Sequence, residues 1–357
     1  MMPEEWPIAP APGDQAHAPA RVAGRDRLAT VRVDFFLNPS SRLTEQERAL
    51  MTAMLHCLIG DIADELRAAL PSGVVAANDE SNLDLIEALS HAGLLDRLVL
   101  VRLLLRRADE ERIATAARAR SGRREARVLQ GLVSHEDGAI SAAAMALILA
   151  RGRRRDRFSQ CLLHFDDLPP HEAAAVVHVV AAALRRDLVA GHGPAKADRL
   201  LADASEQVLS RHDPGSGIEA LANILLRFLE EEGGLTDDLL AAAAMEGEMT
   251  FVGQALARRA RLRGDVALDE LLSGSDERVM GVMRMAHVQR EAVAGILAGI
   301  GDLLGIADAG RAITVFDRLG EIQVEDARSW LTTDPAYRRS VAELGAGNGA
   351  GNGQRTV

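Results

Sequence analysis

Apolar residues recur at helical spacing along most of the chain, and residues 42–66 show this most clearly. One apolar stripe in that stretch has spacings of three and four positions, which place it on a single helix face. Thr44 and Glu47 precede the stripe with the spacing of a capping box. Leu50 and Ile59 add apolar surface beside it, so we expect this helix to pack on more than one neighbour. The stripe consists of Met51, Met54, Leu55, Leu58, Ile62 and Leu66.

The same apolar period, with residues typical of helix starts and ends, continues through most of the rest of the chain. Pro169 and Pro170 stand at the start of one expected helix, where a missing amide hydrogen costs nothing, and Gly233 and Gly234 close another. A chain rich in Ala and Leu, with only 3% aromatic residues, also favours helices over strands. We expect further helices at 82–91, 94–107, 109–119, 123–134, 137–151, 156–165, 170–190, 195–211, 217–232, 236–246, 250–263, 266–273, 276–287, 289–304, 308–319, 323–332 and 335–344.

The predicted architecture is all-α, with a HEAT-like α-solenoid of helix pairs over 35–232 and a smaller compact helical domain over 235–344. Helix pairs that recur about every 30 to 40 residues are typical of such solenoids. Residues 1–27 are rich in Pro, Ala and Gly without an apolar period and are predicted to be a disordered leader. Residues 345–357 are predicted to be a flexible tail.

Charge is unevenly distributed along the sequence. The formal net charge of -11 argues against general nucleic-acid binding, yet residues 97–157 hold fifteen Arg against seven acidic residues. One interpretation of this run is a solvated surface in a genome that prefers Arg codons, which the ratio of 40 Arg to 1 Lys supports. The other is a basic face for an acidic protein partner. Nucleic acid is a weaker alternative because few aromatic residues are present to stack bases. The candidate partner-binding residues are Arg106, Arg107, Arg123, Arg124, Arg153, Arg154 and Arg155.

One cluster of side chains has the composition of a metal site. Its members fall on expected neighbouring helices, and a metal-dependent enzyme is therefore an alternative function. The simpler interpretation is a buried thiol, an aspartate that caps a helix and exposed histidines, so we expect no metal, no cofactor and no catalytic residue. Lys196, the single lysine, lies outside any phosphate-loop motif. The cluster consists of Cys161, His164, Asp166, Asp167, His171 and His178.

Several segments resemble a known family. "VDFFLNPSSRLTEQERALMTAMLHCLIGDIADELRAALP", "GLLDRLVLVRLLL", "RREARVLQGLVSHEDGAISAAAMALIL" and "FDDLP" are similar to a large proteobacterial family of uncharacterised proteins, common in alphaproteobacteria. The likeness runs from about residue 33 to 190 and continues weakly to the end. It implies a HEAT-type helical repeat fold and no assigned activity. At 164–167 this chain has "HFDD" where the family has an Arg-containing stretch.

These patterns together predict a non-catalytic protein–protein interaction or regulatory module. The 44–70 helix is expected to cap the solenoid or to form a homo-oligomer. No apolar run reaches the roughly 18 residues that span a bilayer, so no membrane contact is expected. Cys57 and Cys161 are the only cysteines and no secretory signal precedes them, which favours the cytoplasm.

Overall fold

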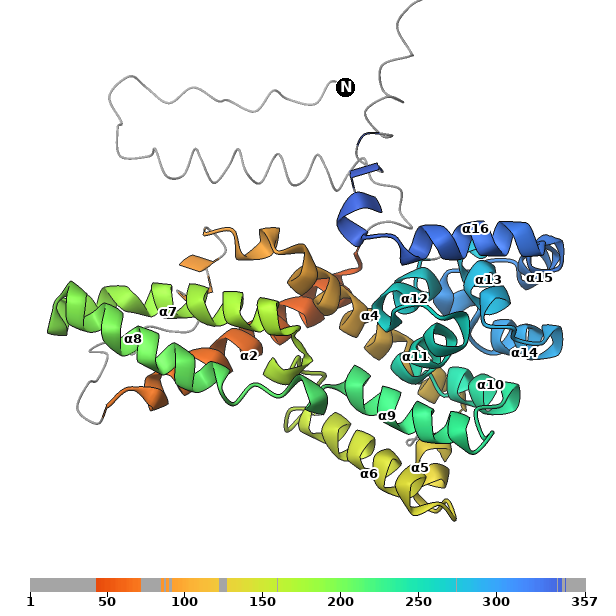
Figure 1. Cartoon of the computed structure of the whole chain (residues 1–357), viewed down its shortest axis with the longest axis horizontal. Helices are drawn as coiled ribbons and strands as arrows, with labels where there is room; N and C mark the ends of the chain where they lie inside the picture. Colours follow the sequence, from red (N-terminus) through yellow and green to blue (C-terminus); the bar gives the residue numbers. More distant parts are fainter. Residues whose placement is uncertain are drawn as a thin grey trace, which may run out of the picture. The chain divides into compact units, whose positions relative to one another are not determined.

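The computed structural model describes residues 43–71, 85–86, 88–89, 92–121, 127–158, 160–273, 275–338, 340–341 and 344. Within these ranges every regular element is a helix (Figure 1). The one β-type pairing there is an isolated bridge between Arg155 and Cys161. The prediction of an all-α fold is therefore confirmed for the described part of the chain.

Among the described helices, those of the first two thirds of the chain are longer than those that follow, except for one of 7 residues. The earlier helices are α2 (Glu45–Ala69), α4 (Leu98–Ser121), α5 (Arg127–Val133), α6 (Gly138–Arg153), α7 (Pro170–His192), α8 (Pro194–Leu209) and α9 (Ile218–Glu231). Shorter helices follow: α10 (Asp237–Met245), α11 (Met249–Ala260), α12 (Gly264–Leu271), α13 (Asp276–Met285), α14 (Arg290–Ile300), α15 (Ala309–Arg318) and α16 (Glu321–Thr332). Single 3-10 turns are η3 (Leu94–Asp96), η4 (Phe165–Asp167), η5 (Pro214–Ser216) and η6 (Asp302–Leu304).

In the first unit of the chain, which ends at Arg48, the described residues include the N-terminal turn of α2. The Thr44 amide and hydroxyl donate to the Glu47 carboxylate at 2.7 and 2.9 Å. The Glu47 amide donates back to Thr44 Oγ1 at 3.1 Å. The predicted capping box is confirmed.

The second unit begins at Ala49 and contains two apolar cores. The first core is formed by α2, the N-terminal half of α4, and α7 and α8, which lie side by side (Figure 1). The predicted stripe of α2 is buried here from Met54 to Leu66, and Ile59 on its flank is fully buried as well. Of the flank that suggested a dimer contact, Ile59 is therefore covered by this chain itself, whereas Leu50 is half-buried.

The second core is formed by the C-terminal half of α4 together with α5, α6 and α9 to α16. In it α9 packs on both α6 and α11, and α13 packs on α15. Gly233 has a φ of 70° and the Gly234 amide donates to the Leu229 carbonyl at 2.7 Å, which ends α9 as expected. The same core continues beyond these glycines, so the predicted domain boundary falls inside it.

Three of the predicted helices differ in the structure. The expected break between 94–107 and 109–119 is wrong, because α4 runs without interruption through that position. The helix expected at 156–165 is also wrong. The Asp156 carboxylate accepts hydrogen bonds from the Phe158 and Gln160 amides, both at 2.8 Å. Those bonds fold the backbone into a turn in place of a helix.

Over the residues that the structure describes, the chain crosses between the two cores three times. It crosses first within α4, where Leu104 lies in the first core and Ile113 in the second. It returns between α6 and η4, and it crosses again between α8 and α9. Among the described helices, none has both the length and the apolar content needed to cross a bilayer.

Candidate binding site

A group of buried and half-buried polar side chains occupies the place where the three crossings meet, and we call it the ion-pair seam. Arg107, on α4, is only 2% exposed and donates through Nη2 to both carboxylate oxygens of Glu219 at 2.7 Å. Its Nη1 donates to Glu110 at 2.7 Å. Burial disfavours the charged form, but Glu219, Glu110 and Asp167 outweigh burial and raise the pKa of Arg107. The seam consists of Arg107, Glu110, Arg154, Asp167, Glu219 and Thr250.

Arg154 follows α6 and is the second buried guanidinium of the seam. Its Nε and Nη2 bind Asp167 at 2.8 to 3.0 Å, while Nη1 and Nη2 donate to the carbonyls of Ala150 and Ser216. The Asp167 carboxylate also accepts from the His164 and Ile218 amides, both at 3.2 Å. Burial favours the neutral acid, yet Arg107 and Arg154 lower the pKa of Asp167. The seam thus joins all three crossings through charge-assisted hydrogen bonds.

A cavity of about 770 Å³ opens beside the seam, between α4, α6 and the start of α11. Its charged lining is internally paired. Glu111 binds Arg155 at 2.8 Å and Arg118 at 3.1 Å, and Arg151 binds Glu248. Cys161 also lines the cavity, and burial raises the pKa of its thiol to about 11, so the thiol is protonated at neutral pH.

The seven candidate arginines do not lie together on one face. Arg107 and Arg154 are interior, and Arg106 binds Asp269 at 2.8 Å with only 10% of its side chain exposed. Arg155 binds Glu111, and Arg153 is exposed and pairs with no carboxylate among the described residues. Arg123 and Arg124 lie outside the described residues.

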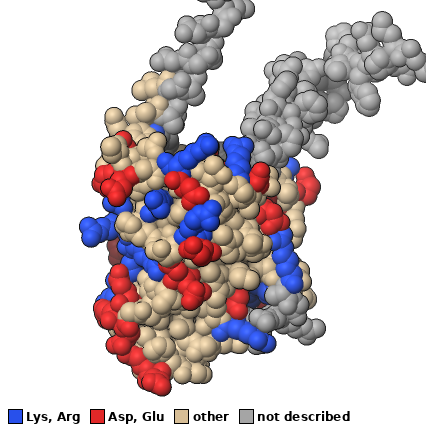
Figure 2. Space-filling model, turned by 90° about the vertical axis from the view of Figure 1, so that its right-hand side faces the viewer, with Lys and Arg blue, Asp and Glu red and all other residues tan. Residues whose placement is uncertain are grey.

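Figure 2 shows acidic and basic side chains interspersed over the face of the molecule that lies at the right of Figure 1. On that face no large basic field stands out. The arginine excess of residues 97–157 is offset in space by carboxylates from distant helices, such as Asp269 and Asp302. Sequence position alone gave no sign of these partners.

The members of the candidate metal cluster have separate roles. His164 caps η4, where its Nδ1 accepts from the Asp166 amide at 3.3 Å. The Asp166 carboxylate accepts from the Asp213 amide and the Ser216 hydroxyl. His171 and His178 are exposed on α7. Within the described residues, no group of three or more His, Cys, Asp or Glu is arranged to hold a metal ion.

The outer face of α6 is a feature that the sequence reasoning missed. The helix GAISAAAMALILARGR has almost no polar residue before Arg151, so it is apolar on all sides. One side packs in the second core, yet Met145 and Leu149 are 42% and 57% exposed on another side. A helix that is apolar all round is normally covered all round, and this pattern was a readable signal.

Neither the curated proteins nor the solved structures compared with this chain include a match. A family described as "Uncharacterised protein conserved in bacteria (DUF2336)" matches residues 86–325, which are more than half of the chain. This stretch holds the three crossings, the seam and the outer face of α6. The chain therefore belongs to this family of uncharacterised bacterial proteins.

Proposed function

We propose that the chain is a non-catalytic helical-repeat module that binds another protein along the outer face of α6. The HEAT-like interpretation is part of this proposal. It is supported by a row of helices in which α9, α11, α13 and α15 each pack on the next. These helices begin at Ile218, Met249, Asp276 and Ala309, so the row advances by about one helix pair at each step.

The observation that carries the proposal is the exposed apolar stripe on α6. Ala142, Met145 and Leu149 are exposed at spacings of three and four positions, the register in which one helix receives another. Exposed apolar residues that are contiguous on one helix mark interaction surfaces more often than isolated ones do. Arg153 continues the same stripe one turn beyond Leu149 and is also exposed.

The charge at the end of the stripe indicates the chemistry of the partner. Arg153 has no carboxylate partner among the described residues, and the nearby Arg157 guanidinium lies 4.7 Å from the centre of the exposed Phe158 ring. A partner segment that fits is an amphipathic helix with an apolar face and carboxylates at one end. Such charges steer association and fix the orientation of the docked helix. A cytoplasmic setting fits this role, because both cysteines are free thiols.

The test is site-specific photo-crosslinking from position 149 in the native host, followed by measured binding of the identified segment to the purified chain. We expect a crosslinked protein with an acidic amphipathic helix, and we expect Met145→Glu with Leu149→Glu to weaken its binding at least about tenfold. Ile322→Glu is the matched control, since Ile322 is 79% exposed on α16 and its change should leave the affinity unchanged. Equal binding by both variants would overturn the proposal.

A further inference from the structure

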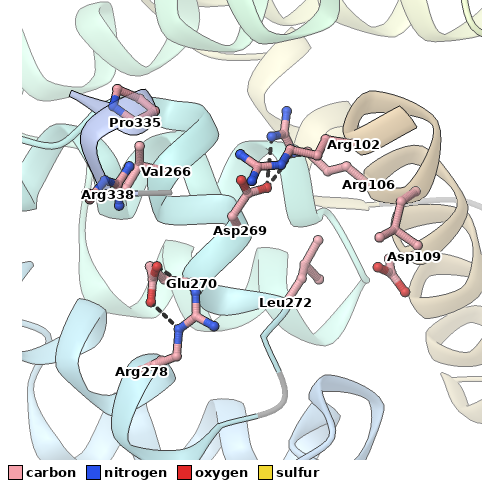
Figure 3. A pocket seen from close by; sticks show the side chains of 11 residues that line it. Arg102, Arg106, Asp109, Val266, Asp269, Glu270, Leu272, Arg278, Pro335 and Arg338 are labelled. Carbon is pink, nitrogen blue, oxygen red and sulfur yellow. Dashed lines mark hydrogen bonds and ion pairs between the residues drawn. The ribbon is translucent and has the colours of Figure 1, made fainter. Parts of the chain in front are cut away.

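A second cavity, of about 430 Å³, lies away from α6 between α4, α12, α13 and the helical turn at residues 335–338. Four arginines and three acidic residues line it. Figure 3 shows Arg102 and Arg106 entering from α4 on one side and Arg338 from the opposite side. Its size is within the range of small-molecule sites.

The acidic residues of this cavity are already bound by other arginines. Asp269 accepts from Arg106 at 2.8 Å, and Glu270 accepts two bonds from Arg278 at 2.6 and 2.7 Å. Asp109 binds Arg112, which is not part of the cavity wall. The carboxylates therefore orient Arg106 and Arg278, and none of the three forms an ion pair with Arg102 or Arg338.

Arg102 and Arg338 are the two cavity arginines without a partner in the part of the chain that the structure describes. Arg102 is exposed at the rim and forms no ion pair there. Arg338 is half-buried, and its Nε is buried without any hydrogen-bond acceptor. A half-buried guanidinium without an acceptor is unfavourable, so an anion that reaches the Arg338 guanidinium from the cavity would be stabilised.

We propose that this cavity binds a small organic dianion, a dicarboxylate or a phosphate compound, held between Arg102 and Arg338. The guanidinium fork matches carboxylate and phosphate oxygens in the same bidentate geometry, so both ligand types share the chemistry of recognition. The ligand would bridge α4 to residues 335–338 and so hold that turn against α12. This site is independent of the α6 face, and its anion would control the position of the C-terminal turn.

Trp330 offers a local readout of binding, because its ring lies 6.4 Å from that of Tyr337, the residue before Arg338. The full chain carrying Trp6→Phe retains Trp330 as its one tryptophan. Succinate, pyrophosphate and inorganic phosphate are titrated at low ionic strength, with chloride as the non-specific control. We expect saturable fluorescence changes with succinate or pyrophosphate but not with chloride, and the tighter ligand identifies the class.

Substitutions of single arginines distinguish binding in this cavity from non-specific attraction of anions to a basic surface. Arg102→Gln and Arg338→Gln should each weaken binding about tenfold, and Arg338→Lys should recover part of that loss, since it keeps charge without the fork. Arg227→Gln, at an exposed arginine of α9 outside the cavity, should leave the affinity unchanged. The proposal is overturned if no probe saturates, or if the Arg102 and Arg338 variants bind as tightly as the Arg227 variant. Neither outcome affects partner binding at α6.

Discussion

The two cores use similar residues but are closed by helices of different lengths. The first core rests on long helices, with 25 residues in α2 and 23 in α7, whereas helices α10 to α16 of the second core have 8 to 12 residues each. Short helices need many tight turns. Accordingly, among the described residues, Gly233, Gly247, Arg261, His287 and Gly305 have positive φ in the second core region, against Gly93 and Gly193 in the first. The second core thus depends on turn geometry at more places than the first does.

Ion pairs join the two cores where the chain crosses between them. Arg154 leaves the second core at the end of α6, and Asp167 stands at the entry to the first. Arg107 lies within α4, which belongs to both. The seam can therefore be broken, and each core perturbed, by separate substitutions.

Arg154→Met should have the largest effect, because it leaves the Asp167 carboxylate buried without its main partner. Removing one member of a buried ion pair typically costs about 3 to 5 kcal/mol. We expect a loss of that size in the free energy of unfolding, measured by urea titration with circular dichroism. The neighbouring exposed Arg153→Met is the control and should change stability by less than about 0.5 kcal/mol. A loss below about 1 kcal/mol for Arg154→Met would show that the seam does not hold the cores together.

Gly247→Ala should perturb the second core alone. The backbone there has a φ of 76°, and an added Cβ would lie 2.6 Å from the Ala114 Cα of α4. Strain of this kind costs about 1 to 3 kcal/mol, so we expect a loss near 2 kcal/mol in the same assay. Gly191→Ala is the control in the first core, because Gly191 lies within α7 and a Cβ there meets nothing within 4 Å. It should be neutral or stabilising, and similar losses for both variants would show that strain at Gly247 is not the cause.

Lowering the pH should have the smallest of the three effects on stability, through protonation of Asp167 in the seam. The pKa of Asp167 is lowered below its ordinary value of 3.8, so its stabilising effect is complete above that value and is lost as the pH falls through the lower folded value. We expect Asp167→Asn to be less stable than the original chain by a constant amount from about pH 7 to 5. That difference should shrink below about pH 4. A difference that stays unchanged at pH 3 would assign the effect to packing and not to charge.

Helix positions were readable from the sequence where local chemistry sets them. The capping box of Thr44 and Glu47, and the end of α9 at Gly233, depend on neighbours in sequence and were predicted correctly. The candidate face was not, because the partners of Arg106 and Arg107 lie 163 and 112 residues away. An arginine is buried here because a carboxylate on a distant helix pairs with it, and no local sequence pattern predicts that pairing.

The interleaving of the cores also sets an order of events during synthesis. The first core lacks α7 and α8 until Leu209 has been made, and α6 finds its main partner only when α9, beginning at Ile218, emerges. At bacterial elongation rates of about 5 to 20 residues per second, the apolar length of α6 waits roughly 3 to 15 seconds for that cover. During this interval the nascent chain presents a helix that is apolar up to its last turn, apart from Ser141, to the ribosome surface and its chaperones. The order of the three crossings thus leaves α6 without its α9 cover during this part of synthesis.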